Sequence, residues 1–263
     1  MVTNKKSAAP QGDDLEIIQA SLSDLNLTVI AKSLEDHLRS AQEGGVSYSE
    51  FLRRILVEEA TGRYERKLAR SLKRSNLGAS KSLEEFDFTV RKKLTKAAVM
   101  ELLGCHWIKE GRSIICVGRS GTGKTHLAKA LAKAACMKGY SVLYVTAADM
   151  LDEIHAALAD NTYHRIFKRY EKVDLLVCEE LGYLPLKKEK ADHLFRLVSA
   201  RHPTKPMLVT ANTGFENWGK FFPSQAQAIA TIDRLIDQAT ILRFTGKTFR
   251  KPKEVIGESL EEE

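Results

Sequence analysis

An eight-residue segment, GRSGTGKT at residues 118–125, constrains the fold of this chain more than any other feature of the sequence. It satisfies the pattern G-x-x-x-x-G-K-[ST] in full. It also lies between an apolar run, SIICV, and a stretch rich in Ala, Leu and Lys that is typical of a helix. A strand, a glycine-rich loop and a helix in this order form a phosphate-binding unit. We therefore expect a strand that ends at Gly118 and a helix that begins at Lys124.

The residue types in this segment suit a triphosphate bound with Mg²⁺. Glycines at 121 and 123 let the backbone curl so that successive N–H groups point at phosphate oxygens, and the helix start adds partial positive charge. Lys124 is expected to reach the β and γ phosphates, and the Thr125 hydroxyl to ligate Mg²⁺. The predicted nucleotide contacts are Gly118, Arg119, Ser120, Gly121, Thr122, Gly123, Lys124, Thr125 and His126.

From Thr89 onward, apolar strands alternate with amphipathic helices. This alternation is typical of a parallel sheet covered by helices on both faces. We therefore predict an α/β fold, with a P-loop ATPase domain over residues 89–255. The expected strands are 113–118, 141–146, 173–178, 206–212 and 240–244, and the clearest expected helices are 124–138, 189–201 and 224–236.

A nucleotide hydrolase also needs an acid at the end of a neighbouring strand, and the run DLLVCEE at 174–180 supplies two. Glu180 is the candidate for orienting or activating the attacking water. Glu179 lies where an aspartate usually holds the coordination shell of the metal. Its extra methylene should push the carboxylate outward, and Mg²⁺ tolerates little distortion of its octahedral shell. We expect this glutamate to affect the rate of hydrolysis more than the binding of ATP.

The first third of the chain predicts a small helical domain at residues 15–75. The run from Leu15 to Ala41 has apolar residues at nearly helical spacing, and Gly44 and Gly45 end it. Ser47 and Glu50 form a capping box at the start of the next helix. We expect a disordered lead-in at residues 1–14, a linker at 76–88 and an acidic tail at 256–263.

The charge of the chain favours an anionic partner. Its formal net charge is +7 and its pI about 9.1, which makes nucleic acid the first candidate. Clustered cations on one side of a helix release counterions from a phosphate backbone, although a solvated helix face is the alternative. The candidate DNA-binding residues are Arg63, Arg66, Lys67, Arg70, Lys73 and Arg74, with Lys187, Lys188 and Lys190 further along the chain.

Other features of the sequence indicate the cellular compartment. No apolar run is long enough to cross a bilayer, and the first residues lack the apolar segment of a secretory signal. The four cysteines form no CxxC pair, which argues against zinc and disulfides. We expect a cytoplasmic protein with reduced thiols and no membrane partner.

Three further runs carry a family resemblance: GKTHLA at 123–128, LGYLPL at 181–186 and FENWG at 215–219. With the P-loop and the acid pair, they resemble the IstB-type transposition helper ATPases of the AAA+ group, which stand beside the bacterial helicase loaders. The resemblance spans about residues 15–255. It implies that Asn212 helps to position the water, that Arg234 reaches the nucleotide of a neighbouring subunit, and that Arg250 is a second sensor arginine. The usual acidic pair of the family is Asp-Glu, from which Glu179 departs.

The resemblance also implies a function. Such a protein uses ATP and Mg²⁺, assembles as a homo-oligomer on duplex DNA, deforms the DNA and presents it to a cognate transposase. Two alternatives stay open. One is a loader that acts on a replicative helicase. The other is a DNA-clamping switch in which Glu179 leaves ATP bound and barely hydrolysed, so that Glu179→Asp would raise ATPase activity.

Overall fold

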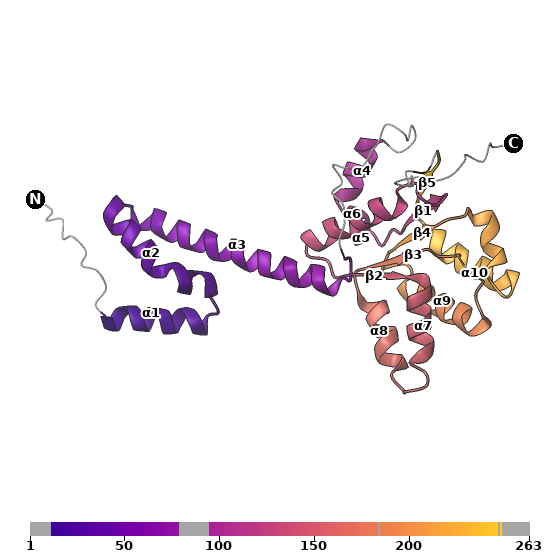
Figure 1. Cartoon of the computed structure of the whole chain (residues 1–263), viewed down its shortest axis with the longest axis horizontal. Coiled ribbons are helices and arrows are strands. Elements are labelled where there is room, and N and C mark those ends of the chain that lie inside the picture. Colours follow the sequence, from indigo (N-terminus) through magenta and orange to yellow (C-terminus); the bar gives the residue numbers. More distant parts are fainter. Residues whose placement is uncertain (1–11, 79–94, 184, 247, 249–263) are drawn as a thin grey trace, which may run out of the picture. The chain divides into compact units, whose positions relative to one another are not determined.

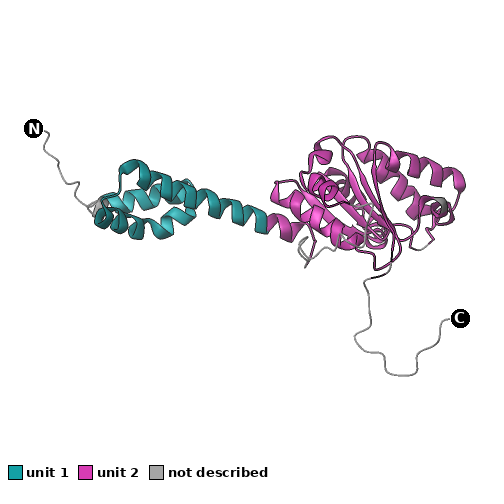
Figure 2. Ribbon diagram, turned by 90° about the horizontal axis from the view of Figure 1, so that it is seen from above, with its two compact units in different colours: residues 1–69 teal, residues 70–263 magenta. Residues whose placement is uncertain are grey.

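The chain forms two compact units, residues 1–69 and 70–263, which Figure 2 colours separately. This computed structural model describes residues 12–78, 95–183, 185–246 and 248. The predicted lead-in up to residue 11, residues 79–88 of the predicted linker, and the predicted acidic tail lie outside the described residues.

The first unit consists of helices α1 (Gly12–Asp24), α2 (Thr28–Gly44) and the first part of α3 (Tyr48–Arg74). Its small core is formed by Ile30, Leu34 and Ile55. The sequence predicted one helical run up to Gly44, but the run is divided near Asn26, whose φ of 55° is left-handed. Asparagine tolerates this conformation better than most residues, so a helix–turn–helix replaces the single helix that periodicity indicated.

A buried glutamate joins the second and third helices of this unit. Glu59 of α3 is 4% exposed and accepts hydrogen bonds from the backbone N–H groups of Val29 and Ile30, at 2.7 and 3.2 Å. These amides belong to the first turn of α2, which lacks partners within its own helix. Desolvation alone would raise the pKa of Glu59, but the two amides and Arg66 outweigh it and hold this pKa below its ordinary value. The carboxylate is therefore an ionised cap for α2.

The second unit contains a five-stranded parallel sheet in the order β2-β3-β4-β1-β5. The strands are β1 (Ile114–Gly118), β2 (Val142–Thr146), β3 (Leu175–Glu179), β4 (Met207–Ala211) and β5 (Thr240–Phe244). Each lies within two residues of its predicted bounds. The α/β fold and the parallel sheet that the sequence predicted are confirmed.

Helices cover both faces of the sheet (Figure 1). One face is covered by α6 (Lys124–Met137), which contacts β1 through β4, with α4 (Lys96–Leu103) packed on it. The other face packs against α7 (Ala147–Ala156), α8 (Tyr163–Lys172), α9 (Lys188–Arg201) and α10 (Gln225–Ile236), and holds the main core. Two short helices, α5 (His106–Lys109) and η2 (Phe215–Lys220), complete the described elements. Because side chains alternate along a strand, each strand serves both layers.

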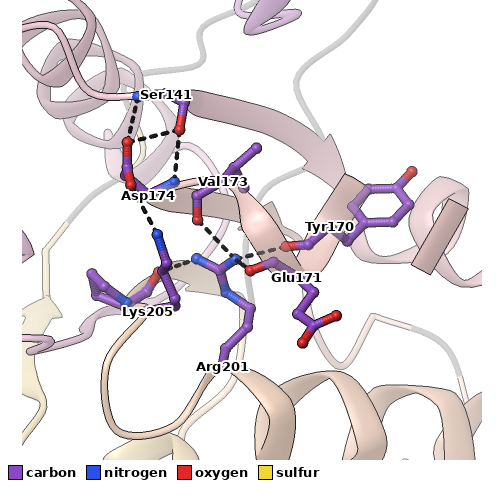
Figure 3. A network of polar contacts seen from close by, with 8 residues as sticks. Ser141, Tyr170, Glu171, Val173, Asp174, Arg201 and Lys205 are labelled. Atoms are coloured by element: carbon purple, nitrogen blue, oxygen red, sulfur yellow. Dashed lines mark hydrogen bonds and ion pairs between the residues drawn. The ribbon is translucent and has the colours of Figure 1, made fainter. Parts of the chain in front are cut away.

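A buried arginine fastens the edge of the sheet where the strands begin (Figure 3). Arg201, at the end of α9, is 1% exposed and donates hydrogen bonds to the backbone carbonyls of Tyr170, Glu171, Val173 and Pro206. These carbonyls close the end of α8 and precede β4. Burial lowers the pKa of the guanidinium to about 10, which still leaves Arg201 charged at neutral pH. It caps α8 and rigidifies this edge.

None of the helices in the described residues has the length and apolar character that crossing a membrane requires. All four cysteines are buried free thiols. Burial raises the pKa of Cys116 and of Cys178 to about 12, so neither thiol ionises at neutral pH.

Candidate nucleotide-binding site

The site is built at the edge of the sheet where the parallel strands end. Strand β4 lies between β1 and β3, so the phosphate loop after β1 and the acids at the end of β3 flank the end of β4. Strands in a sheet are about 4.8 Å apart, which separates the loop and the acids by about 10 Å. That gap can hold the terminal phosphates of a nucleotide with a metal ion and a water molecule between them.

The phosphate loop has the predicted conformation. Strand β1 ends at Gly118, Gly123 adopts a φ of 89°, and α6 begins at Lys124. Lys124 is buried, and its ammonium donates hydrogen bonds to the backbone carbonyls of Gly118 and Arg119 at 2.7 and 2.9 Å. The Thr122 hydroxyl also donates to the Arg119 carbonyl at 2.7 Å. The lysine is thus already folded over the loop whose amide groups would hold phosphates.

The residues around the loop are available to a ligand. Arg119, Ser120 and Thr125 are exposed, and His126 is half-buried. Asn212 follows β4 directly and lines a cleft together with Gly118 and Arg119. A polar side chain at the end of the strand between the loop and the acids suits the predicted role of Asn212 in positioning a water molecule.

Gly118 is required for a second reason that the motif does not reveal. Its φ is +152°, and a Cβ atom built on it would lie 2.1 Å from the carbonyl oxygen of Phe244 in β5. Residues that carry a Cβ atom rarely adopt this backbone conformation, and the atom that the Cβ would meet belongs to the rigid backbone of β5. The glycine therefore allows β5 to pair closely with β1 at the phosphate loop.

We expect Gly118→Ala to destabilise the protein by at least about 2 kcal/mol and to weaken ATP binding. The added methyl group must displace either β5 or the loop. Thermal unfolding followed by circular dichroism would measure the first effect and nucleotide titration the second. Gly219→Ala is the matched control, because its Cβ would meet nothing within 4 Å. Equal melting temperatures for the two variants would contradict this account.

Glu179 is the last residue of β3 and is only 9% exposed. One carboxylate oxygen, Oε2, accepts a hydrogen bond from the Tyr144 hydroxyl. The other, Oε1, is buried and has no hydrogen-bond partner among the described residues. An orphaned carboxylate oxygen and the exposed Thr125 hydroxyl are both hard oxygen donors of the kind that Mg²⁺ takes. These residues fit a Mg²⁺ ion bound with the nucleotide.

Glu180 has an unusual backbone. Its φ of 59° is left-handed, a conformation that costs a non-glycine residue free energy and often marks functional sites. Thr210 of β4 holds it there, because the Thr210 hydroxyl accepts from the Glu180 N–H at 3.0 Å and the Thr210 carbonyl accepts from the Leu181 N–H at 2.9 Å. The Glu180 side chain is exposed. This exposure suits the predicted role of Glu180 in acting on a water molecule, which stays a prediction.

Arg234 is far from this edge of the sheet. It lies in the last turn of α10, which leads into the start of β5. It lines a small cavity with Ser113, just before β1, and with Met207, the first residue of β4. The five-residue strand β1 separates this region from the phosphate loop, a distance of about 16 Å along the strand. Arg234 therefore lies at the opposite edge from the nucleotide site of its own chain.

The Arg234 side chain is exposed but makes two contacts within its own chain. Its guanidinium lies over the ring of Phe195 in α9, 4.9 Å from the ring centroid, and donates to the Ala230 carbonyl at 2.9 Å. The predicted sensor Arg250 lies outside the described residues, so its role stays a prediction.

The predicted DNA-binding cations are all exposed or half-exposed, but they differ in their contacts. Arg63 and Arg66 form ion pairs with the buried Glu59, which gives both a structural role. Lys190 pairs with Asp152. The exposed cations without an ion pair in the described part of the chain include Lys67, Lys73, Arg74, Lys187 and Lys188.

Sequence reasoning missed two residues of the site, Tyr144 and Thr210. Both act through hydrogen bonds to the acid pair on neighbouring strands, and strand order decides such contacts. Burial and the Glu179 carboxylate raise the pKa of Tyr144, which keeps the hydroxyl protonated as a donor. The sequence held only a weak indication of Thr210: it precedes the predicted site residue Asn212 by two residues in the run VTAN.

A parallel sheet with β4 between the P-loop strand and the acid strand, and with these side chains at its edge, defines an AAA+ ATPase. The family model described as IstB-like ATP binding protein matches residues 20–255, and the chain belongs to that family. It is 32% identical over 237 residues to the insertion sequence IS21 putative ATP-binding protein of Pseudomonas aeruginosa, covering 90% of this chain and 88% of that protein.

Solved structures with the same fold are more distant. The AMPPCP-bound DnaA of Aquifex aeolicus is 22% identical with a TM-score of 0.54, over 64% of this chain and 51% of that chain. DnaI is 19% identical with a TM-score of 0.54, over 64% of this chain and 92% of that chain. The family identifies an ATPase associated with insertion-sequence transposition, and the two solved structures show that its fold is like that of DnaA and DnaI. The predicted resemblance is confirmed.

Proposed function

We propose that this protein is the ATP-dependent helper of a DNA transposition system. It assembles as a homo-oligomer on duplex DNA, deforms the DNA, and recruits or activates a cognate transposase. ATP and Mg²⁺ are its cofactors. Membership of the IstB-like family supports the link to transposition, and the residues described above support the chemistry.

The position of Arg234 is the observation that carries the assembly step. An arginine that neutralises charge on a transferred phosphoryl group must contact it. Arg234 lies at the edge where the strands begin, whereas Lys124 and Glu180 lie at the edge where they end. The arginine can therefore serve only a nucleotide held by a second copy of the chain. Such an arrangement makes the ATPase complete only in an oligomer and couples assembly to bound ATP.

Contacts between cations and phosphates would supply DNA affinity with little sequence preference. The chain has a net charge of +7, and each additional subunit would add further phosphate contacts. Bending a short duplex costs several kcal/mol, of the order of 1–6. An oligomer that repeats the same contacts along the duplex can offset that cost, whereas one subunit offers few contacts. This supports the proposal that deformation follows assembly.

A triple substitution tests the DNA-binding residues. We expect replacing Lys67, Lys73 and Arg74 with glutamine to weaken ATP-dependent binding to duplex DNA. The plot of log affinity against log salt concentration should become shallower by about 0.9 for each phosphate that these side chains neutralise in the wild type. The control replaces Lys32, Lys109 and Lys133, three exposed lysines outside the candidate set, and removes the same net charge. Equal salt slopes for the two triple variants would show that Lys67, Lys73 and Arg74 do not contact the DNA.

A partner assay separates the transposition helper from a helicase loader. The wild-type protein, with ATP and a duplex, is mixed with the purified transposase of its own element or with the replicative helicase of its host. We expect co-sedimentation with the transposase and a rise in ATP turnover. Binding to the helicase alone would refute the proposed function and favour the loader.

A further inference from the structure

Tyr144 and Glu179 occupy one face of the sheet, on neighbouring strands. In the register of β2 and β3, Tyr144 is opposite Val177 and Thr146 is opposite Glu179, so the two side chains are diagonal neighbours on the same face. This is the face that α6, the helix of the phosphate loop, covers, because Lys129 of α6 lies over the Tyr144 ring, 5.2 Å from its centroid. The tyrosine therefore lies under the helix that begins the nucleotide site.

The contact between the two residues gives the two carboxylate oxygens of Glu179 different surroundings. The Tyr144 hydroxyl donates to Oε2, while Oε1 stays buried without a hydrogen-bond partner among the described residues. A buried acceptor without a partner is costly, so Oε1 is the oxygen that a ligand would complete. A glutamate side chain has one more rotatable bond than that of an aspartate. Without the tyrosine, the position of the Glu179 carboxylate would therefore be less well defined.

We infer that Tyr144 is a positioning residue for Glu179: its hydroxyl fixes the longer acid so that this side chain can serve the Mg²⁺ of bound ATP. The inference rests on the ATP site of the proposed function, and it names what compensates for the extra methylene. Mg²⁺ demands nearly ideal geometry from its ligands and from the waters they hold. Outer partners that orient a ligand commonly change metal affinity by tenfold to a hundredfold.

The backbone of Tyr144 is held on both sides, although β2 is an edge strand, with a neighbouring strand on one side only. Its backbone N–H donates to the carbonyl of Ser75 at 2.7 Å, and its own carbonyl accepts from the Asn76 side chain at 3.4 Å. Residues 75 and 76 follow the end of α3 and belong to the same compact unit as β2. They clamp both backbone groups of the tyrosine on the open side of the strand. A positioning residue needs this support, because it cannot be more ordered than its backbone.

The Tyr144→Phe variant tests the inference, because it removes the hydroxyl and keeps the ring over which Lys129 lies. A fluorescent ATP analogue is titrated with the full-length protein at increasing Mg²⁺, without DNA or transposase. We expect the half-saturating Mg²⁺ concentration to rise about tenfold, while the affinity for the analogue in EDTA stays unchanged. An unchanged Mg²⁺ requirement would overturn the inference alone, because neither DNA nor transposase takes part. The proposed function fails separately, in the partner assay.

A second tyrosine provides a matched control. Tyr170 is 1% exposed, and its hydroxyl donates to the carboxylate of Glu153 on α7, on the other face of the sheet. Tyr170→Phe therefore removes a bond of the same chemical kind away from the nucleotide. We expect a similar change in melting temperature from the two variants, but an unchanged Mg²⁺ requirement from Tyr170→Phe.

The same titration in a Glu179→Asp background completes a double-mutant cycle. Aspartate is one methylene shorter and does not keep the bond to Tyr144, so adding Tyr144→Phe should change the Mg²⁺ requirement less than about twofold. A merely structural tyrosine would show the same effect in both backgrounds and overturn the inference. If Tyr144 instead holds Glu179 away from the metal, Tyr144→Phe lowers the Mg²⁺ requirement, and the inference also fails.

Discussion

The Lys124→Ala variant is expected to bind ATP about 10- to 100-fold more weakly than the wild type and to lose ATP-dependent binding to duplex DNA. Lys124 is 6% exposed, and its ammonium is already directed over the loop by the carbonyls of Gly118 and Arg119. Alanine removes the cation that neutralises the β and γ phosphates and removes the ammonium hydrogen bonds to these two carbonyls, of which the Arg119 carbonyl keeps the bond from the Thr122 hydroxyl. Equilibrium titration with a fluorescent ATP analogue measures the first effect, and filter binding with ATP measures the second.

The matched control for this variant is Lys133→Ala. Lys133 is an exposed lysine of the same helix, α6, so the change in net charge and in helix composition is the same. We expect it to retain both ATP affinity and ATP-dependent DNA binding. Undiminished DNA binding by Lys124→Ala in the presence of ATP would show that the phosphate loop does not control the DNA interaction, and the proposed function would fall.

The parts of the site that sequence reasoning located are those where neighbouring residues act together. The run from Gly118 to Thr125 is such a segment, because a strand, a turn and a helix start are specified within eight residues. The acid pair was located for the same reason, as two carboxylates directly after an apolar strand. Strand bounds followed from periodicity and were accurate to within two residues. The family resemblance then added roles that no local pattern carries.

The remaining features depend on strand order and register, which a single sequence does not specify. The hydrogen bond from Tyr144 to Glu179 exists only because β2 and β3 are neighbours in a particular register. The left-handed Glu180 depends on Thr210 of β4, 30 residues away. Gly118 is also needed for the close approach of β5, although the motif explains it by phosphate binding alone. The break at Asn26 was missed because asparagine tolerates helix and turn alike.

The Arg234→Ala variant is expected to keep its ATP affinity within about twofold and to lose ATP turnover by roughly 10³-fold or more. The nucleotide of the same chain lies at the other edge of the sheet, so the first quantity does not depend on Arg234. The second depends on it because, in the proposed assembly, the arginine contacts the transferred phosphoryl group of a neighbouring copy. Arg234→Lys should restore little of the ATP turnover, since lysine lacks the planar, forked guanidinium group of arginine. Nucleotide titration and phosphate release, with duplex DNA present, measure the two quantities.

Arg196→Ala is the control for the stacked arginine. Arg196 is exposed on α9, and its guanidinium lies 5.4 Å from the ring centroid of Tyr163, so this substitution removes a stacked guanidinium just as Arg234→Ala removes the one over Phe195. We expect Arg196→Ala to retain turnover and assembly. An equal decrease of turnover in both variants would indicate a defect in packing and would contradict a catalytic role for Arg234.

Mixing two inactive variants provides the decisive measurement for a shared site. In Glu180→Gln the acid is removed but Arg234 is intact, whereas Arg234→Ala keeps the acid and lacks the arginine. An Arg234→Ala subunit that is followed in the assembly by a Glu180→Gln subunit regains a complete site at their boundary, so a mixture should recover part of the wild-type turnover. Recovery should be greatest near equal proportions and should require DNA, because the proposed assembly on DNA places Arg234 of one subunit at the nucleotide site of the next. A mixture that stays as inactive as its components would show that Arg234 does not act between subunits.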